Sequence, residues 1–293
     1  MVQSTEHVPV MVEEVLAHLA VGRGDTVVDG TLGGGGHARR LAEAVGDTGR
    51  VIALDRDPQA IAHARTHLSG LPIIPIEANY GDLPEVLGEL GIASVRGVLL
   101  DLGLSSDQLA DVSRGFSFDS PGPLDLRFNP CDGEPAWRLV NKLREKNLAD
   151  LIYQYGEERR SRRIAKAIVA ARRTEPIKTA AALAEVVRRA VPRSRGERID
   201  PATRTFQALR IAVNREIDSL ETALRRIPDC LAPGAALAVI SFHSLEDRPV
   251  KLAFREDARL EVLTRRPIRP SEEEVLRNPR SRSAKLRVAR RRP

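Results

Sequence analysis

Short apolar runs alternate with stretches of helical periodicity along the first third of the chain. The runs are rich in Val, Ile and Leu, as expected of buried strands, and the stretches between them carry apolar residues three and four positions apart. The pattern predicts strands at 26–29, 50–55, 73–78 and 97–101. It predicts helices at 9–19, 37–45, 58–68 and 83–90. This alternation is typical of a parallel sheet with helices on both faces, so we expect a Rossmann-like, doubly wound α/β fold.

The alternation stops after residue 105 and returns at residue 200. An interval of this length is too long for a structureless loop in a compact domain. Helical periodicity begins near Trp137, and the clearest helices are predicted at 147–155, 159–174 and 179–190. We therefore expect an inserted all-helical subdomain at 106–200 and a main domain formed by 1–105 and 201–293.

The remaining segments are assigned from the same patterns. Residues 114–130, RGFSFDSPGPLDLRFNP, combine phenylalanine with proline and arginine and are expected to form an ordered loop over the cleft. Residues 201–227 are predicted to form one long helix. Strands are expected at 235–242 and 285–289.

Four consecutive glycines, Gly33 to Gly36, follow the first predicted strand and precede a predicted helix. A strand, a glycine-rich turn and a helix in this order form the nucleotide-binding corner of a doubly wound sheet. Glycine allows the tight turn and lets a ligand approach the backbone. Asp55 ends the second strand 19 residues after Gly36, where an acid usually binds the two hydroxyls of a ribose. This geometry is shared by NAD and S-adenosylmethionine sites.

Asp29, at the end of the first strand, favours S-adenosylmethionine. A carboxylate there suits a cationic ligand and would be unfavourable beside a pyrophosphate. The G-x-G-x-x-G spacing of dinucleotide sites is also incomplete, because Arg39 stands where the third glycine would follow Gly34 and Gly36.

Polar residues follow three further strands. Tyr80 and Asp82 lie after the third strand, where they could stack on and hydrogen-bond to an adenine. Asp101 ends the fourth strand, and the carboxyl ends of parallel strands share one crevice. His243, with Ser244 beside it, invites a hydrolase interpretation. The G-x-S-x-G elbow of such a triad is absent, so we expect His243 to line the substrate side of the cleft.

Charge is unevenly distributed within a net charge of +6. Residues 138–195 hold 16 Lys and Arg against 6 Asp and Glu, and residues 265–293 hold 11 against 3. A mildly acidic body with two basic segments is expected of a nucleic-acid binder, although solvated helix faces would give the same count.

Other features exclude several classes of protein. The two cysteines, Cys131 and Cys230, lack C-x-x-C spacing, which argues against zinc and against a disulfide framework and fits a reducing cytoplasm. There is no signal-peptide pattern and no apolar run of membrane-spanning length. We therefore expect a cytoplasmic protein that binds no metal.

Several segments together closely resemble one bacterial family, the ribosomal RNA small subunit methyltransferase H family. They are DGTLGGGGH, ALDRDPQAI, DLGLSSDQL, RGFSF, PLDLRF, YGEE, PATRTFQALRIAVN, ISFHSLEDR and NPRSRSAKLR. They follow in matching order from His7 to Arg287. The resemblance implies a class I S-adenosylmethionine-dependent methyltransferase that methylates the exocyclic N4 of one cytidine in the decoding region of 16S rRNA. The partner would be 16S rRNA in the 30S subunit, and the inserted subdomain would recognise it.

The resemblance also implies the cofactor-binding residues. They are Gly34, Gly35, Gly36, His37, Asp55, Tyr80, Asp101 and Gln108. The family usually has phenylalanine where Tyr80 stands, and either ring can stack on a base.

The residue that promotes attack by the amine is less clearly indicated. DNA amino-methyltransferases commonly carry an Asp/Asn-Pro-Pro-aromatic motif after the fourth strand, whereas this chain has Asp101-Leu-Gly-Leu. Asp101 is the leading candidate for orienting the amine or the cofactor, and Ser105, Asn214 and His243 are weaker candidates. Two other functions stay open: a non-catalytic RNA-binding assembly factor and a NAD-dependent oxidoreductase. The sequence also leaves open whether two copies form a homodimer.

Overall fold

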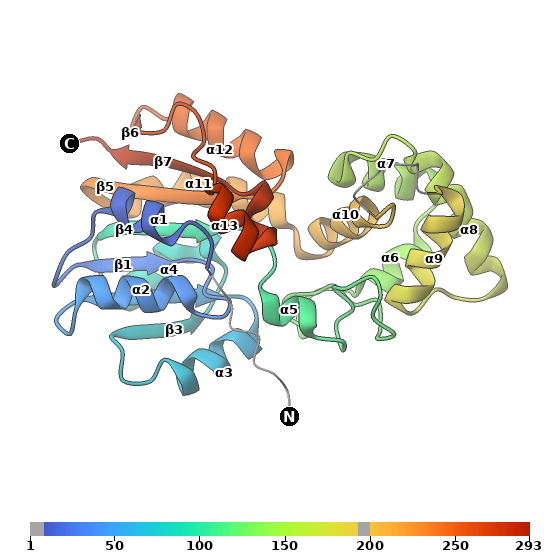
Figure 1. Ribbon diagram of the computed structural model, residues 1–293, viewed down its shortest axis with the longest axis horizontal. Coiled ribbons are helices and arrows are strands. Elements are labelled where there is room, and N and C mark those ends of the chain that lie inside the picture. Colours follow the sequence, from blue (N-terminus) through green and yellow to red (C-terminus); the bar gives the residue numbers. More distant parts are fainter. Residues whose placement is uncertain (1–8, 193–199) are drawn as a thin grey trace. The chain divides into compact units, whose positions relative to one another are not determined.

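The chain folds as two compact units, which Figure 1 colours by position in the sequence. The structure is a computed structural model that describes residues 9–192 and 200–293. The sheet unit comprises Met1–Ser105 with Ile217–Pro293, and the helical unit comprises Ser106–Glu216. None of the helices within the described ranges is both long and apolar enough to cross a membrane.

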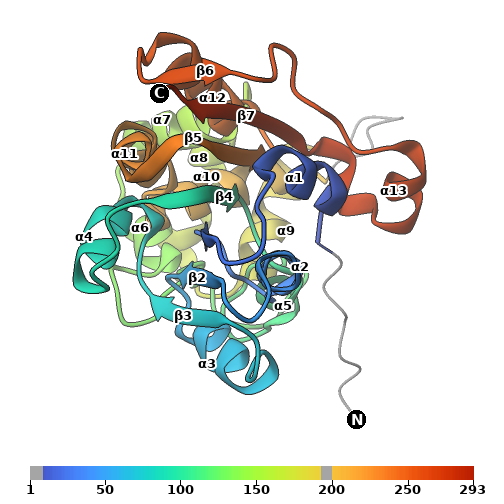
Figure 2. The ribbon, with the colours of Figure 1, turned by 90° about the vertical axis from the view of Figure 1, so that its left-hand side faces the viewer.

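One sheet organises the sheet unit, with the strand order β3-β2-β1-β4-β5-β7-β6 among the described residues (Figure 2). The strands are β1 (Thr26–Asp29), β2 (Arg50–Asp55), β3 (Ile73–Glu77), β4 (Val95–Asp101), β5 (Leu231–Ser241), β6 (Leu260–Val262) and β7 (Lys285–Arg291). Strands β1 to β5 pair in parallel, and β7 runs antiparallel to both β5 and β6. The predicted Rossmann-like sheet is confirmed.

Successive residues of the central strands face opposite sides of the sheet, as strand geometry requires. Val28 and Leu100 belong to one buried cluster, and Val27 and Leu99 belong to the other. The first cluster is covered by α4 (Leu83–Glu89), α11 (Glu216–Cys230) and α12 (Ser244–Glu256). The second is covered by α1 (Val12–Leu19), α2 (Gly36–Val45) and α3 (Pro58–His67). Burial on both faces explains why these strands are continuous apolar runs rather than alternating ones.

The helical unit contains α5 (Ser106–Ala110), α6 (Ala136–Lys142), α7 (Glu145–Gly156), α8 (Ser161–Thr174), α9 (Ala180–Ala190) and α10 (Thr203–Asn214). Its longer helices bury apolar residues at a spacing of four, as Leu148 and Ile152 do on α7. A side chain at Gly156 would place its Cβ 2.5 Å from the carbonyl oxygen of Arg204, so glycine lets α7 approach α10 closely.

Asn214 holds the segment at 114–130, which forms an ordered loop without a helix or extended strand, as expected. Its Nδ2 donates to the carbonyl oxygens of Leu126 (2.7 Å) and Arg210 (2.9 Å). Its Oδ1 accepts the backbone N–H of Phe128 at 2.8 Å. The buried amide of Asn214 therefore ties this loop to α10.

The predicted long helix at 201–227 is wrong. Arg215 has a left-handed backbone, with φ of 51°, and separates α10 from α11. The boundary between the units accordingly lies after Glu216 rather than after residue 200. Neither glycine nor proline marks this break, and apolar spacing continues across it, so the sequence pattern alone could not locate it.

Several smaller elements were also missed or displaced. The first helix begins at Val12 rather than residue 9, because Met11 is left-handed with φ of 55°. The sequence pattern does not indicate α12, whose interior contains Pro249, nor β6 or α13 (Glu272–Arg277). Strand β6 is only three residues long, too short for a periodic signal.

Candidate functional site

Three acidic residues end adjacent strands at one edge of the sheet. Asp55, Asp29 and Asp101 are the last residues of β2, β1 and β4, which are neighbours in that order. Because these strands are parallel, their carboxyl ends meet at the same edge, which is where open α/β sheets bind ligands. The structure thus brings together the acids that the sequence predicts.

The glycine loop connects β1 to the start of α2 beside these acids. Gly33 and Gly35 have φ of 49° and 80°, in the left-handed region that glycine adopts without strain. Gly34 lies between them in the turn. A Cβ at Gly35 would lie 2.6 Å from the Leu68 side chain, and one at Gly36 would lie 2.9 Å from the Pro9 ring. The loop therefore requires glycine for packing as well as for conformation.

Asp55 is fixed by the loop that it faces. Its Oδ2 accepts the backbone N–H of Gly33 at 2.8 Å, and its Oδ1 accepts that of Asp57 at 2.9 Å. Burial raises the pKa of Asp55 to about 6, against the lowering effect of these hydrogen bonds. A carboxylate held in one orientation beside a glycine turn can accept hydrogen bonds from ligand hydroxyls.

Asp29 is fully buried, and only one of its oxygens is used. Oδ1 accepts the backbone N–H of Thr31 at 3.1 Å, whereas Oδ2 has no hydrogen-bond partner within the described chain. Burial is the main cause that raises the pKa of Asp29 to about 7, and the charge of Asp55 adds to it. A buried acid with an unused oxygen is unfavourable unless a donor or a cation completes it.

Asp101 has the same feature at the next strand. Its Oδ1 has no hydrogen-bond partner among the residues described. Burial, followed by the charges of Asp29 and Glu246, raises the pKa of Asp101 well above its ordinary value. Its backbone N–H donates to Thr31 Oγ1 at 2.7 Å, which links the ends of β1 and β4. Two incompletely bonded acids at adjacent strand ends form an environment that favours a positively charged ligand.

His37 lies at the start of α2, and its side chain is buried. Nε2 lies 2.9 Å from the carbonyl oxygen of Val10, and Nδ1 lies 3.5 Å from Asp101 Oδ2. His37 is a predicted cofactor residue, but the sequence gives no sign that Val10 is its neighbour. No local pattern connects residues so far apart in the chain.

The loop after β4 and the start of α12 complete this edge. Ser105 lies beside the glycine loop, since a Cβ at Gly33 would be 3.3 Å from its Cβ. His243 precedes α12, and its Nε2 lies 3.0 Å from Glu246 Oε1. Glu246 is buried, and its Oε2 accepts the backbone N–H of Phe242 at 2.8 Å. The imidazole of His243 is thus next to a buried acid that also influences Asp101.

The other predicted residues are distributed between the two units. Tyr80 is half-buried in a short helical turn after β3, and a Cβ at Gly30 would lie 3.1 Å from its Cβ. Asp82 is exposed. Gln108 and Asn214 belong to the helical unit, where both are buried. The Asn214 amide makes the three hydrogen bonds described above, so the structure gives it a structural role.

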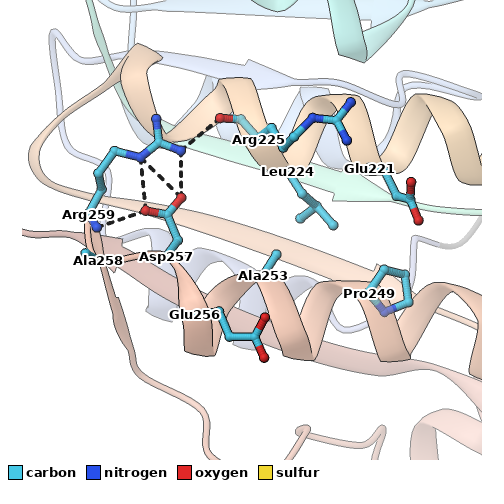
Figure 3. A pocket seen from close by; sticks show the side chains of 9 residues that line it. All are labelled: Glu221, Leu224, Arg225, Pro249, Ala253, Glu256, Asp257, Ala258 and Arg259. Carbon is cyan, nitrogen blue, oxygen red and sulfur yellow. Dashed lines mark hydrogen bonds and ion pairs between the residues drawn. The ribbon is translucent and has the colours of Figure 1, made fainter.

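A hollow of about 450 Å³ lies elsewhere in the sheet unit, between α11 and α12 (Figure 3). Leu224 and Ala253 line it from the two helices. At one end Arg259 pairs with Asp257 at 2.7 Å and donates to the carbonyl oxygen of Arg225 at 2.9 Å. Its lining includes neither the glycine loop nor the strand-end acids, so we do not place a cofactor there.

Comparison with known proteins agrees with this geometry. The chain is similar to "Ribosomal RNA small subunit methyltransferase H" from Rhodopirellula baltica, with 52% identity over 298 residues that cover 98% of this chain and 92% of the relative. The proteins of the same name from Thermomicrobium roseum and Acidobacterium capsulatum are 49% and 50% identical. These matches cover 98% and 97% of this chain, and 94% and 97% of the respective relatives.

The family model described as "MraW methylase family" matches residues 4–292. The match spans both parts of the sheet unit and the helical unit between them. The matched residues include every strand of the Rossmann-like sheet, with antiparallel β7 between β5 and β6. With half of its residues identical to those of full-length relatives, this chain belongs to the MraW methylase family.

Proposed function

We propose that this protein transfers a methyl group from S-adenosylmethionine to the exocyclic N4 of a cytidine in the decoding region of 16S rRNA. The observation that carries the proposal is the pair of acids beside a glycine loop, Asp29 and Asp101, each of which has a buried oxygen without a hydrogen-bond partner in the described chain. Family membership and the names of the relatives supply the substrate class.

The residues present fit this cofactor. Asp55 would accept hydrogen bonds from the two ribose hydroxyls, and Tyr80 would present an aromatic face to the adenine. The glycine loop would let the ligand approach the backbone, and the incompletely bonded oxygens of Asp29 and Asp101 suit a ligand with positive charge. When bound, S-adenosylmethionine would supply a methyl group already activated by its sulfonium sulfur, and the bond from that sulfur to the methyl group would break to leave S-adenosylhomocysteine.

The protein must then place and activate the amine. The N4 lone pair of cytosine is delocalised into the ring, so the amine is a poor nucleophile. A carboxylate that accepts a hydrogen bond from the amine makes its lone pair more available and can take the proton lost when the new N–C bond forms. We assign this role to Asp101 Oδ1, because it is buried and has no hydrogen-bond partner in the described chain. Holding the amine in line with the methyl group supplies the rest of the acceleration.

The helical unit provides cations that suit an RNA backbone. On α8, Arg162, Arg163, Lys166 and Arg173 are exposed, and none has an ion-pair partner among the residues described. On α7, Tyr153 is 62% exposed, so its ring is available to stack on an unpaired base. We propose that these side chains bind 16S rRNA, in the 30S subunit, so that the target base can be turned out of the folded RNA.

A labelled-methyl transfer assay tests the function. S-adenosylmethionine with a labelled methyl group is incubated with unmethylated 30S subunits or naked 16S rRNA, and the RNA is digested to nucleosides. We expect label in N4-methylcytidine and in no other nucleoside. Label in another nucleoside would refute the cytidine assignment. An absence of label despite cofactor binding would instead favour a non-catalytic assembly factor.

The variant that tests the chemical step in this assay is Asp101→Asn, which keeps the shape of the side chain but cannot accept a proton. We expect transfer to fall by about 100-fold or more while the variant still binds 16S rRNA. A variant that transfers label at the wild-type rate would remove Asp101 from the chemical step.

A further inference from the structure

A continuous series of contacts connects Asp101 to the amino-terminal and carboxyl-terminal segments of the sheet unit. The backbone N–H of Met11 donates to Glu274 Oε1 on α13 at 2.7 Å. The neighbouring carbonyl of Val10 lies 2.9 Å from His37 Nε2. On the other side of the ring, Nδ1 lies 3.5 Å from Asp101 Oδ2.

The contact between Val10 and His37 fixes the orientation of the imidazole. A carbonyl oxygen can only accept, so His37 Nε2 must carry the hydrogen. The carbonyl itself is held in place, because Met11 is fixed in a left-handed conformation and Pro9 packs against Gly36. Since the ring is buried, it has little freedom to rotate away from this partner.

The contact between His37 and Asp101 determines how Asp101 is presented. With Nε2 directed at Val10, Nδ1 faces Asp101 Oδ2 and leaves the opposite oxygen, Oδ1, unpartnered within the described residues. Two other charged groups act on Asp101: Asp29 at the end of β1 and Glu246 on α12. Both are acids and repel its charged form, and an imidazole that carries a hydrogen on Nδ1 as well as on Nε2, and therefore a positive charge, is a neighbour able to offset them.

We propose that His37 is a positioning residue for Asp101, oriented by the Val10 carbonyl, and that it holds Asp101 Oδ1 toward the amine of the substrate. The inference rests on the proposed function and assigns the His37 side chain a role beyond cofactor binding. A group that orients another through a hydrogen bond to its far side is a recurrent device in active sites, and its loss typically reduces activity by about 10- to 100-fold.

A double-mutant cycle separates positioning from simple structural support. His37→Gln retains a donor that can reach Val10 but has no atom equivalent to Nδ1. If His37 acts through Asp101, we expect His37→Gln to lower single-turnover methyl transfer by about tenfold in the wild-type background. In the Asp101→Asn background it should change the rate by less than about twofold, because its target is already lost. Losses that multiply, or a wild-type rate in His37→Gln, would overturn the proposal.

His63→Gln is the matched control, since His63 is an exposed histidine on α3, away from the strand-end acids. It should leave transfer unchanged. The same cycle is measured on the affinity for S-adenosylhomocysteine, which needs no RNA. If the effects of His37→Gln and Asp101→Asn on this affinity are not additive, the contact between His37 and Asp101 is supported even if the wild type methylates nothing. Failure of the proposed function and failure of this inference can therefore be told apart.

A second measurement covers the case in which His37→Gln does not fold. Nitrogen NMR of the wild type should show the His37 ring protonated at both Nε2 and Nδ1, and Asp101→Asn should shift the Nδ1 resonance of that ring. The His63 resonances should not move. An unchanged His37 ring in Asp101→Asn would overturn the proposal.

Discussion

Asp29 and Asp101 each keep one carboxylate oxygen without a hydrogen-bond partner among the described residues, at the ends of two adjacent strands. Thr31 connects them, because its backbone N–H donates to Asp29 and its hydroxyl accepts from the backbone N–H of Asp101. The charge on Asp29 is one cause that raises the pKa of Asp101. Ionisation of one acid therefore disfavours ionisation of the other unless a positive charge lies close to both.

Stability without cofactor should fall as pH rises. The pKa of Asp29 is raised from 3.8 to about 7 and that of Asp55 to about 6. At pH values between 3.8 and about 7, Asp29 and Asp55 hold protons in the folded protein that they have released in the unfolded chain. Raising the pH through this range therefore favours unfolding. We expect Asp29→Asn to raise the free energy of unfolding at pH 8 by about 1–3 kcal/mol and to flatten its pH dependence. Chemical denaturation across pH 5 to 8 measures this, with exposed Asp47→Asn as control. An identical slope in Asp29→Asn and wild type would contradict the assignment.

Cofactor binding should release protons near neutral pH. A positively charged ligand stabilises the ionised forms of Asp29 and Asp101, so their pKa values fall on binding and affinity rises with pH. Calorimetry of S-adenosylmethionine binding at pH 6.5, in buffers with different ionisation enthalpies, should detect net release of up to about one proton. Asp29→Asn should release less. Proton uptake, or no exchange at all, would refute a cationic ligand at these acids.

Gly35→Ala should be much more harmful than substitution of another left-handed glycine. Gly35 and Gly70 have φ of 80° and 88°. A Cβ at Gly35 would lie 2.6 Å from the Leu68 side chain, whereas a Cβ at Gly70 would have no heavy atom within 4 Å. Gly70→Ala should cost about 1 kcal/mol of stability from backbone strain alone, and Gly35→Ala about 2–4 kcal/mol. Thermal unfolding compares them directly. Equal effects would mean that Leu68 moves aside without cost.

Reversing the charge of the α8 cations should weaken the RNA complex and leave cofactor affinity intact. We expect the triple change of Arg162, Arg163 and Lys166 to Glu to lower 30S affinity by at least about 100-fold at low salt and to reduce its salt dependence. Arg50→Glu with Arg65→Glu is the control, because both are exposed cations of the sheet unit. Filter binding at several salt concentrations measures the effect. An equal loss in the control would indicate only nonspecific attraction by net charge.

The sequence predicted the sheet well because its central strands are buried on both faces. A run such as Val51 to Leu54 has no other stable location than the core, and the glycine loop and Asp55 follow from the same local order. The acids at the strand ends could be placed together because parallel strands end at one edge. Local pattern and topology were sufficient for this much.

What could not be predicted depends on contacts between distant segments. Arg215 adopts a left-handed conformation that its neighbours in sequence do not require. Asn214 appeared to be a candidate for catalysis, but its amide is used by a loop almost ninety residues earlier. The partner of His37 is a backbone carbonyl, which carries no side-chain signal. Each of these features is decided by packing in the folded state rather than by local preference.

The pairing of β4 with β5 has a consequence for how the chain reaches its folded state. Asp101 is paired with Ile240, and the entire helical unit lies between them in the sequence. During synthesis β4 must remain with one open, apolar edge until the helical unit and then β5 have been made. An unpaired buried strand is prone to join another chain, so slow translation of the insertion would expose this protein to aggregation through β4.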